Sequence, residues 1–389
     1  RVDGVIRVHC AGRRIYDLLG ATDRLGLLIT EGPHKDTQDL QLPVLRWFNR
    51  HLRGDDPLVA TAAERAFRPE ELRVFTTIPA DERTARIHDT FVPAAPPPTP
   101  PVSAAEWTRQ RDSWMAALEG KVFGGWPTRA DVAQVQVQRT RHVERNNVRL
   151  ETWELESQPF VSLQVQVLRR TGGRRPTSVV LEVVDQAGWE AWTGALGAAF
   201  GEPVVPPAGA AAAGTTQRMP AFEEIRRRAL ENRQAHVVLA PRGVGPNSWT
   251  GDAKKQIQIR RRFQLLGQTL DGMRVWDIRR AIEALREIPG LGRAPLTVRA
   301  QGAMGVNVLY ASLFTPGIDQ LELRALPASH RDGPDYLNVL RFLDIDGAAA
   351  MAAERCRVQL RGVDSDDWEY PRAVSRALGW APDQFEVGD

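Results

Sequence analysis

Lysine is scarce in this chain, and its scarcity limits what the positive charge can mean. Only four of the 51 basic side chains are lysine. The chain also has 48 acidic side chains, so its net charge is only +3. The arginine runs at 226–228 and 260–262 are short and suit solvated helix faces or ion pairs better than phosphate binding. The abundance of arginine, alanine and proline is typical of a GC-rich genome. We therefore expect no nucleic-acid partner.

Cysteine is almost absent. Cys10 and Cys356 lie far apart, with no C-x-x-C spacing and no neighbouring histidine cluster. Two lone thiols support neither a disulfide framework nor a zinc site, and we expect both residues to be buried free thiols. The glycine–lysine motifs of phosphate-binding loops are also missing. No metal or cofactor is predicted.

Long apolar runs are absent as well, so no membrane span is predicted, and no signal peptide is visible. The first residue is Arg1 rather than methionine, which suggests a truncated N-terminus and a lost targeting segment. At 389 residues, two domains are expected.

One absence concerns chemistry directly. Residues 295–311 read as strand, sharp turn and helix, which is the context of the nucleophile elbow G-x-S-x-G. Gly302 occupies the position of the serine and Ala300 that of the first glycine. The motif occurs nowhere else in the chain. The sequence thus indicates hydrolase architecture without a complete hydrolase site.

The first part of the chain resembles the closing segment of a parallel α/β sheet. A helix is predicted over 4–20, a buried strand over 25–30, and a second helix over 38–52. A loop containing His34 separates the strand from the second helix.

The proline-rich stretch 93–101 predicts an extended spacer, and the domain boundary is expected there. It lies in a linker over 55–130 that includes one short helix, over 103–118. Alternating apolar residues then predict antiparallel strands over 132–137, 148–153 and 161–167.

The remainder alternates between strands and helices. Strands are predicted over 179–184, 236–240, 296–301, 321–326, 357–360 and 384–387. Helices are predicted over 274–286, 334–353 and 369–379. Antiparallel strands that lead into alternating strands and helices match the plan of an α/β-hydrolase.

Several stretches together carry a family likeness: 14–21, 32–36, 240–249, 260–272 and 275–280. With them the chain resembles the bacterial tandem α/β-hydrolases of the acetyl xylan esterase or prolyl-oligopeptidase-like type. The resemblance implies an α/β fold in which residues 1–54 are the C-terminal elements of a first hydrolase domain. Residues 131–389 would form a second, degenerate domain. It also implies a secreted or periplasmic protein.

The resemblance assigns His34 as the catalytic histidine of the first domain, with its serine and acid upstream of Arg1. The alternative is a surface histidine in a Gly-Pro turn. In the second domain Gly302 is the degenerate nucleophile position.

Two further loops of the second domain match the hydrolase plan by position. Arg242, Gly243 and Gly245 would be a vestigial oxyanion loop, or a strand-to-helix connection kept for packing, which the missing serine favours. Asp364 and Asp366 would be a vestigial acid loop. They could instead bind a hard cation or, as we favour, cap the helix that follows.

We therefore expect a fragment of a serine carboxylester hydrolase that deacetylates a polysaccharide such as xylan. One alternative is a peptidase of prolyl-oligopeptidase type. Another is a non-catalytic pseudo-hydrolase that binds a ligand or supports its neighbour. The sequence Ser329-His330 with Asp332 looks like a triad, but we interpret it as a loop, because triad residues rarely adjoin in sequence.

Overall fold

The computed structural model describes residues 2–32, 34–62, 65–91, 93–128, 132, 134–172, 175–200 and 219–388. The chain divides into two compact units, Arg1–Ile87 (unit 1) and His88–Asp389 (unit 2). No helix among these residues is long and apolar enough to cross a membrane. The expected start of the second domain, residue 131, lies outside the described residues.

Unit 1 is helical. It contains α1 (Val2–Leu18), the 3₁₀ turn η1 (Thr22–Arg24), α2 (Gln38–Phe48) and the π-helical turn η2 (Asn49–Arg53). The strand predicted over 25–30 is wrong, since these residues have no regular structure. A lone strand needs a hydrogen-bonding neighbour, and the described part of unit 1 contains no other strand.

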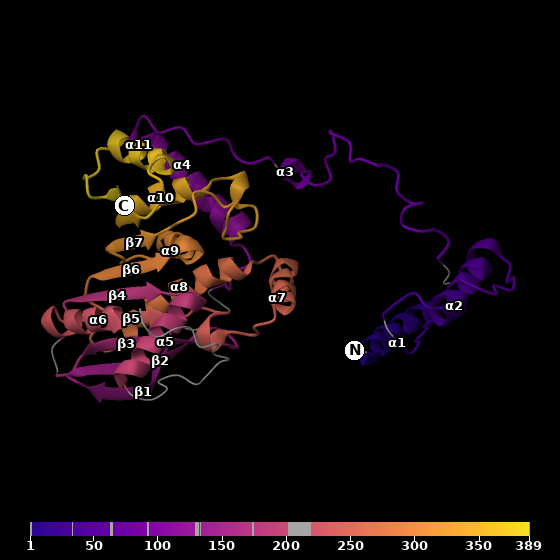
Figure 1. The fold of residues 1–389 in the computed structure, drawn as a ribbon, viewed down its shortest axis with the longest axis horizontal. Coiled ribbons are helices and arrows are strands. Elements are labelled where there is room, and N and C mark those ends of the chain that lie inside the picture. Colours follow the sequence, from indigo (N-terminus) through magenta and orange to yellow (C-terminus); the bar gives the residue numbers. More distant parts are fainter. Residues whose placement is uncertain are drawn as a thin grey trace. The chain divides into compact units, whose positions relative to one another are not determined.

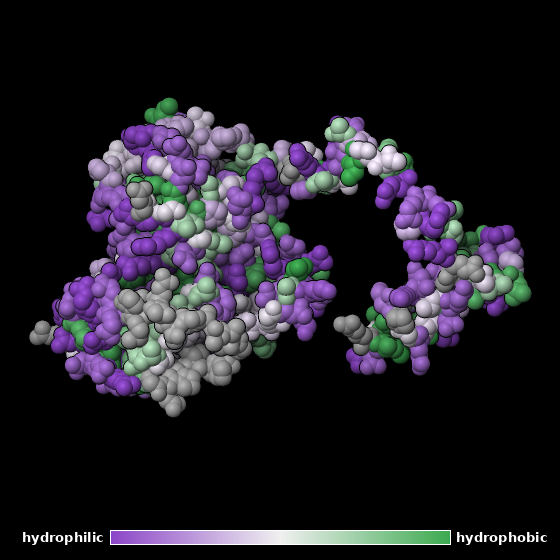
Figure 2. Space-filling model, in the orientation of Figure 1, coloured by the Kyte–Doolittle hydropathy of each residue, from purple (hydrophilic) through white to green (hydrophobic). Residues whose placement is uncertain are grey.

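The helices of unit 1 have no buried residues. Apolar side chains such as Val8 and Leu18 are instead 74% and 83% exposed. Figure 2 shows the resulting hydrophobic areas among the polar atoms of this unit. Cys10 is also exposed, contrary to the expected buried thiol, because the described residues of unit 1 form no buried core.

Unit 2 begins with α3 (His88–Phe91), α4 (Ala104–Ala117) and η3 (Leu118–Val122). The expected linker over 55–130 is wrong for α4 and η3, because both pack into the core. Trp107 is 2% exposed and Leu118 is fully buried. The helix itself starts as its sequence predicts, with Ser103 accepting a hydrogen bond from the backbone N–H of Glu106.

A nine-stranded sheet forms the centre of unit 2, in the order β1-β2-β3-β5-β4-β6-β7-β8-β9 (Figure 1). The first three strands are antiparallel, as is the β3–β5 pair; all later pairs are parallel. The strands are β1 (Val137–Arg145), β2 (Val148–Gln158), β3 (Val161–Arg170), β4 (Ser178–Val183), β5 (Gln234–Leu239), β6 (Leu296–Gln301), β7 (Gln320–Arg324), β8 (Arg357–Arg361) and β9 (Phe385–Gly388).

The position of β1 differs from the predicted strand over 132–137. A tight turn at Asn146 and Asn147, with φ of 51° and 62°, joins β1 to β2 as a hairpin. The turn fixes which residues can face β2, so the strand lies over 137–145. Most of β1 is exposed, whereas most of β2 is buried.

The helices of unit 2 connect the strands of the sheet. They are α5 (Gln186–Phe200), α6 (Met219–Glu231), α7 (Ala253–Leu265), α8 (Leu270–Glu287), α9 (Gly302–Phe314), α10 (Ile345–Ala353) and α11 (Glu369–Ala377). Across the sheet, β5 lies on one side of β4 and β6 lies on the other, so the connection from β4 to β5 and the connection from β5 to β6 run in opposite directions. Right-handed crossovers therefore place α5 and α6 on one face of the sheet and α8 on the opposite face.

The helix predicted over 334–353 is shorter than expected. Only α10 and the 3₁₀ turn η5 (Val339–Arg341) form within it. Asn338 has a φ of +64°, which interrupts a right-handed helix. The carboxylate of Asp344 then accepts the backbone N–H of Ile345 and caps the start of α10.

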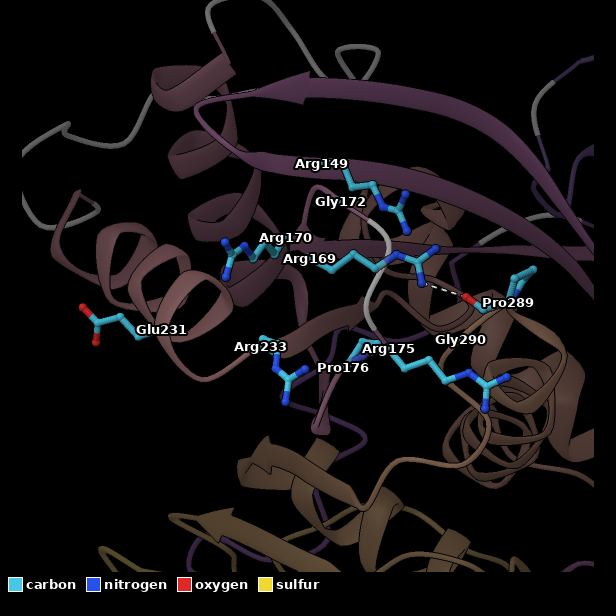
Figure 3. Close-up of a pocket in the computed structure, with 10 residues that line it drawn as sticks. All are labelled: Arg149, Arg169, Arg170, Gly172, Arg175, Pro176, Glu231, Arg233, Pro289 and Gly290. Carbon is cyan, nitrogen blue, oxygen red and sulfur yellow. Dashed lines mark hydrogen bonds between the residues drawn. The ribbon is translucent and has the colours of Figure 1, made fainter.

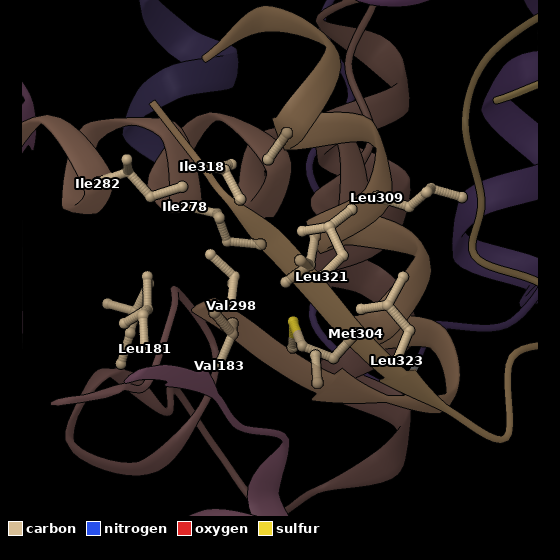
Figure 4. Packing of buried hydrophobic residues seen from close by; sticks show 14 of the residues in the cluster. Leu181, Val183, Ile278, Ile282, Val298, Met304, Leu309, Ile318, Leu321 and Leu323 are labelled. Carbon is tan, nitrogen blue, oxygen red and sulfur yellow. The ribbon is translucent and has the colours of Figure 1, made fainter. Parts of the chain in front are cut away.

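The core of unit 2 lies between the parallel strands and the helices that cover them. Figure 4 shows side chains of β4, β6 and β7 meeting those of α8 and α9. Leu181, Val298, Leu321, Ile278 and Leu309 are all fully buried there. The carboxyl ends of β4, β5 and β6 emerge together from this packed centre, and in open α/β sheets that edge carries the functional site.

Candidate functional site

The turn between β6 and α9 has the backbone of a nucleophile elbow. Gly302 lies at its apex with a φ of +55°, and α9 starts at this residue. A Cβ atom added to Gly302 would meet nothing within 4 Å. A side chain here would project into open space at the carboxyl edge of the sheet, but glycine offers no nucleophile.

The loop expected to be an oxyanion loop lies one strand further from the elbow than that role requires. Residues 241–245 follow β5, and β4 separates β5 from β6. The connection beside the elbow instead follows β4 and enters α5 at Gln186. In this fold the second oxyanion donor comes from the connection after the strand next to the elbow strand.

The amide groups of this loop are already used. The N–H of Arg242 donates to Asp277, that of Gly243 to the carbonyl of Asn247, and that of Gly245 to the side chain of Gln186. None of these three amides remains for a substrate oxygen. The structure therefore contradicts an open oxyanion site at Arg242, Gly243 and Gly245, and supports the packing interpretation.

Close packing explains the glycine at 245. Its φ is +54°, and a Cβ atom there would lie 2.6 Å from the ring of the buried Trp189. Trp192 and Trp276 are buried too, and Trp249 is 49% exposed. Three of these four tryptophans thus serve the core.

Arg242 instead forms a buried ion pair that the sequence did not reveal. Its Nε and one terminal nitrogen contact the two carboxylate oxygens of Asp277 at 2.8 and 2.6 Å. Asp277 is fully buried and also accepts the hydroxyl of Ser157 at 2.6 Å. This bidentate pair fixes the loop after β5 to α8 and β2. In the sequence, Asp277 is one of several charged residues of the amphipathic α8, so it gave no distinct signal.

A second polar cluster joins the first two turns of α8 and α9 to Tyr336. The fully buried Asn307 accepts the hydroxyl of Tyr336 at 2.6 Å and faces Asp271 at 3.5 Å. Asp271 in turn accepts a terminal nitrogen of Arg274 at 2.9 Å. Burial raises the pKa of Tyr336 well above its ordinary value, so its hydroxyl stays protonated and donates.

His330 is anchored inside the loop after β7, as interpreted from the sequence. Its Nδ1 lies 2.9 Å from the carbonyl of Pro334, and its Nε2 lies 2.8 Å from the hydroxyl of Tyr310. Burial lowers the pKa of His330 and raises that of Tyr310. Neutral His330 therefore donates from Nδ1 and accepts from Tyr310. Ser329 bonds to Asp344 rather than to the histidine ring, so no triad forms here.

The predicted acid loop after β8 is a solvated turn. Asp364 and Asp366 are exposed, and Asp364 accepts the backbone N–H of Asp366 at 3.0 Å. The 3₁₀ turn η6 (Asp366–Trp368) then leads into α11. In the part of the chain that the structure describes, no group of three or more acidic, histidine or cysteine side chains is arranged to hold a metal.

His34 belongs to unit 1, where it lies exposed in a bend between η1 and α2. Pro33, which precedes it, lies outside the described residues. The catalytic assignment of His34 stays a prediction.

Comparisons with solved structures identify the fold. A glucuronoyl esterase from Solibacter usitatus matches with a TM-score of 0.53 at 12% identity, covering 75% of this chain and 87% of that one. A promiscuous CE15 esterase from a marine bacterial metagenome has a TM-score of 0.52 at 12% identity, with coverage of 77% and 94%. A proposed acetyl xylan esterase from Bacteroides fragilis NCTC 9343 has a TM-score of 0.53 at 14% identity, with coverage of 73% and 75%. No protein-family model and no curated protein matches the sequence.

These similarities confirm the predicted fold class. The chain has a mixed α/β fold of α/β-hydrolase type, like these esterases. At such low identity the likeness concerns the fold alone, so activity has to be argued from the site.

Proposed function

We propose that this chain acts in the hydrolysis of carbohydrate esters, with unit 2 as a non-catalytic hydrolase-like module. The observation that carries the proposal is the elbow at Gly302, which has the backbone of a nucleophile turn and no nucleophile. The likeness of the fold to glucuronoyl and acetyl xylan esterases supports a carbohydrate ester as the substrate class.

Catalysis in this proposal belongs to the domain of which residues 1–54 are the C-terminal elements. A serine attacks the acyl carbon, His34 relays the proton, and water releases the acyl-enzyme. The exposed apolar side chains of α1 and α2 support this assignment, since such faces normally pack against a sheet. An acetylated polysaccharide such as xylan is the proposed substrate. A prolyl-oligopeptidase-like peptidase is the alternative.

Unit 2 then binds a ligand or supports the catalytic domain. The groups that might have served chemistry at its carboxyl edge are already committed: Arg242 to Asp277, and His330 to Tyr310 and Pro334. These bonded groups have a structural reason to be kept without catalysis.

The non-catalytic assignment is tested with a fluorophosphonate probe and the intact mass of this chain. We expect no adduct on the chain, nor on the Gly302→Ser variant, because His330, in the loop after β7, is already bonded to Pro334 and Tyr310. Ala303→Ser is the matched control one residue away. A stoichiometric adduct on Gly302→Ser, absent from the control, would show that the rest of a catalytic site is intact and would overturn the assignment.

His34 is tested in the protein as its host produces it. Release of acetate from acetylated xylan should fall by at least about 10⁴-fold in His34→Asn, because loss of the triad histidine of a serine hydrolase costs up to about 10⁶-fold. His9→Asn, on α1, should keep its activity. Cleavage of a prolyl peptide without acetate release would favour the peptidase alternative, and unchanged esterase activity in His34→Asn would refute the role of His34.

A further inference from the structure

Arginine side chains line a pocket at the edge of the sheet opposite to the elbow. The pocket lies where β3 and α6 end and where β4 and β5 begin, beside the turn after α8 (Figure 3). Its volume is about 560 Å³. Its charged lining residues are Arg149, Arg169, Arg170, Arg175, Arg233 and Glu231.

Two of these arginines form a like-charged pair across neighbouring strands. Arg149 on β2 lies opposite Arg169 on β3, an arrangement that repulsion disfavours. The buried carboxylate of Glu151 neutralises only part of this charge. It binds Arg169 at 2.7 and 2.9 Å and also accepts Arg139 at 3.2 Å. From Arg149 it is 3.9 Å away, so the buried Nε of Arg149 has no hydrogen-bond partner among the described residues.

Backbone carbonyls at two helix ends satisfy another part of the cluster. A terminal nitrogen of Arg169 donates to the carbonyl of Pro289 at 2.7 Å, and Arg170 donates to that of Leu230 at 3.4 Å. These carbonyls lie at the ends of α8 and α6, where the helix dipole carries about half a negative charge. This structural role accounts for Arg169 and Arg170.

The remaining positive charge has no such partner. Within the described part of the chain, Arg175 and Arg233 form no ion pair. Glu231 is paired with Arg227 on the same helix at 2.9 Å, and Figure 3 shows its carboxylate directed away from the arginine side chains. Around one pocket, Arg149 therefore keeps a buried Nε without a hydrogen bond, and Arg175 and Arg233 add two solvent-accessible guanidinium groups without an ion pair among the described residues.

The excess of positive charge around the pocket also acts on the pKa of Arg169. Burial lowers its pKa from the ordinary value, Glu151 opposes that shift, and Arg149 and Arg139 add to it. A negatively charged ligand would relieve the same repulsion.

We propose that this pocket binds a small oligoanion that carries phosphate or sulfate groups. Guanidinium groups match the oxygens of such groups with paired hydrogen bonds. The volume falls within the range of small-molecule sites, roughly 300–1,000 Å³, and exceeds what one inorganic anion fills. The polar lining, with few apolar side chains, fits a multiply charged ligand better than an apolar one. This inference is independent of the proposed esterase function.

Calorimetric titration of the whole chain with pyrophosphate and with sucrose octasulfate tests the proposal and separates phosphate from sulfate chemistry. The variant Arg149→Gln/Arg175→Gln/Arg233→Gln should bind the preferred probe at least roughly tenfold more weakly, as expected for lost charge-assisted hydrogen bonds. The matched control, Arg109→Gln/Arg261→Gln/Arg262→Gln, removes equal charge from exposed positions outside the pocket and should bind within about twofold of the wild type.

Arg175→Gln alone provides a variant with little risk of misfolding, because Arg175 is exposed. It should weaken binding roughly threefold, as the loss of one of several charged contacts. The absence of saturable binding to both probes would overturn the proposal, as would equal losses in the pocket and control variants. Duplex DNA that binds more tightly than either probe, with the same dependence on the pocket arginines, would overturn it in favour of a nucleic-acid surface.

Discussion

Two glycines have similar backbone angles but different surroundings. Comparing them separates the conformational cost of replacing a glycine from the steric cost. Gly302 and Gly245 have φ of +55° and +54°, respectively. A Cβ atom would enter open space at the first position and would lie 2.6 Å from Trp189 at the second. At Gly302 only the backbone conformation therefore favours glycine. At Gly245 the packing against Trp189 favours it as well.

Alanine substitution should reveal this difference. Gly302→Ala should lower the free energy of unfolding by about 1–2 kcal/mol, the cost of a left-handed residue. Gly245→Ala should lose a further 1–3 kcal/mol or so, because the added methyl group overpacks the core. Urea unfolding followed by circular dichroism measures both. Equal losses would contradict the steric argument.

The pair of Arg242 and Asp277 makes a second prediction about single side chains. Asp277→Ala leaves a buried guanidinium without its partner and should cost about 3–5 kcal/mol of unfolding free energy. The double variant Arg242→Met/Asp277→Leu should recover most of that loss, because no buried charge remains. Ser157→Ala removes one hydrogen bond to the same carboxylate and should cost only about 1 kcal/mol. If the double variant is no more stable than Asp277→Ala, the ion pair is not the cause.

His330 makes the stability of unit 2 depend on pH. Burial lowers its folded pKa below the ordinary 6.5, so both states are neutral at higher pH and the residue then contributes no pH dependence. Below pH 6.5 His330 binds a proton in the unfolded chain but stays neutral in the folded protein. Stability should therefore fall by up to about 1.4 kcal/mol per pH unit.

Urea unfolding between about pH 7.5 and 5.5 should show this slope in the wild type and not in His330→Gln. The carboxyl of Asp346, whose pKa burial raises, acts in the opposite direction. Its effect is present in both proteins and cancels in the comparison. Parallel pH profiles would rule out His330 as the source.

At the scale of elements, the sequence predicted most of unit 2 because its signals are local. Apolar runs located the buried strands β4 and β5, and the turn before α9 located the elbow at Gly302. The errors arose where a partner decides the structure. The segment 25–30 has no neighbouring strand, and β1 is positioned by the asparagine turn that pairs it with β2.

The site could be predicted only in part, for the same reason. The strand, turn and helix around Gly302 were predicted because they form one continuous segment. Arg242 and Asp277 lie 35 positions apart, and the arginine pocket collects residues from the ends of several elements. No local pattern shows that such residues meet.

Helix α4 illustrates a segment that looked like a linker and belongs to the core. Trp107 packs edge-on against Trp114 and Trp380, with ring centroids 6.3 and 6.1 Å apart. Trp107→Ala should cost about 3–5 kcal/mol of unfolding free energy, which urea titration measures. Trp249→Ala, at a half-exposed ring, should change stability by no more than about 1 kcal/mol. Equal effects of the two substitutions would place α4 outside the cooperative core.

At the scale of the whole molecule, the two units differ in their means of stability. Unit 2 has an extensive core, whereas the helices of unit 1 bury no residue. Isolated helices of this length are marginal in water without packing against a partner.

Separate expression of the two units tests this difference. Residues 88–389 should melt cooperatively within about 3 °C of the unit 2 transition in the full chain, because the described buried core residues all lie between Trp107 and Phe385. Residues 1–87 should show weak helical circular dichroism and should bind a hydrophobic dye. A cooperative melt of residues 1–87 would contradict this account.

The exposed hairpin strand β1 has a consequence for the behaviour of the protein at high concentration. It is nine residues long and ends the sheet on one side, where β2 is its only strand neighbour among the described residues. Its side chains include Arg139, Arg141, Glu144 and Arg145, and such charges discourage a second sheet from adding to an open edge. On the other side, β9 is only four residues long and offers little template. The charged side chains of β1 and the short length of β9 thus disfavour the addition of further strands at either edge, and with it the growth of fibrils.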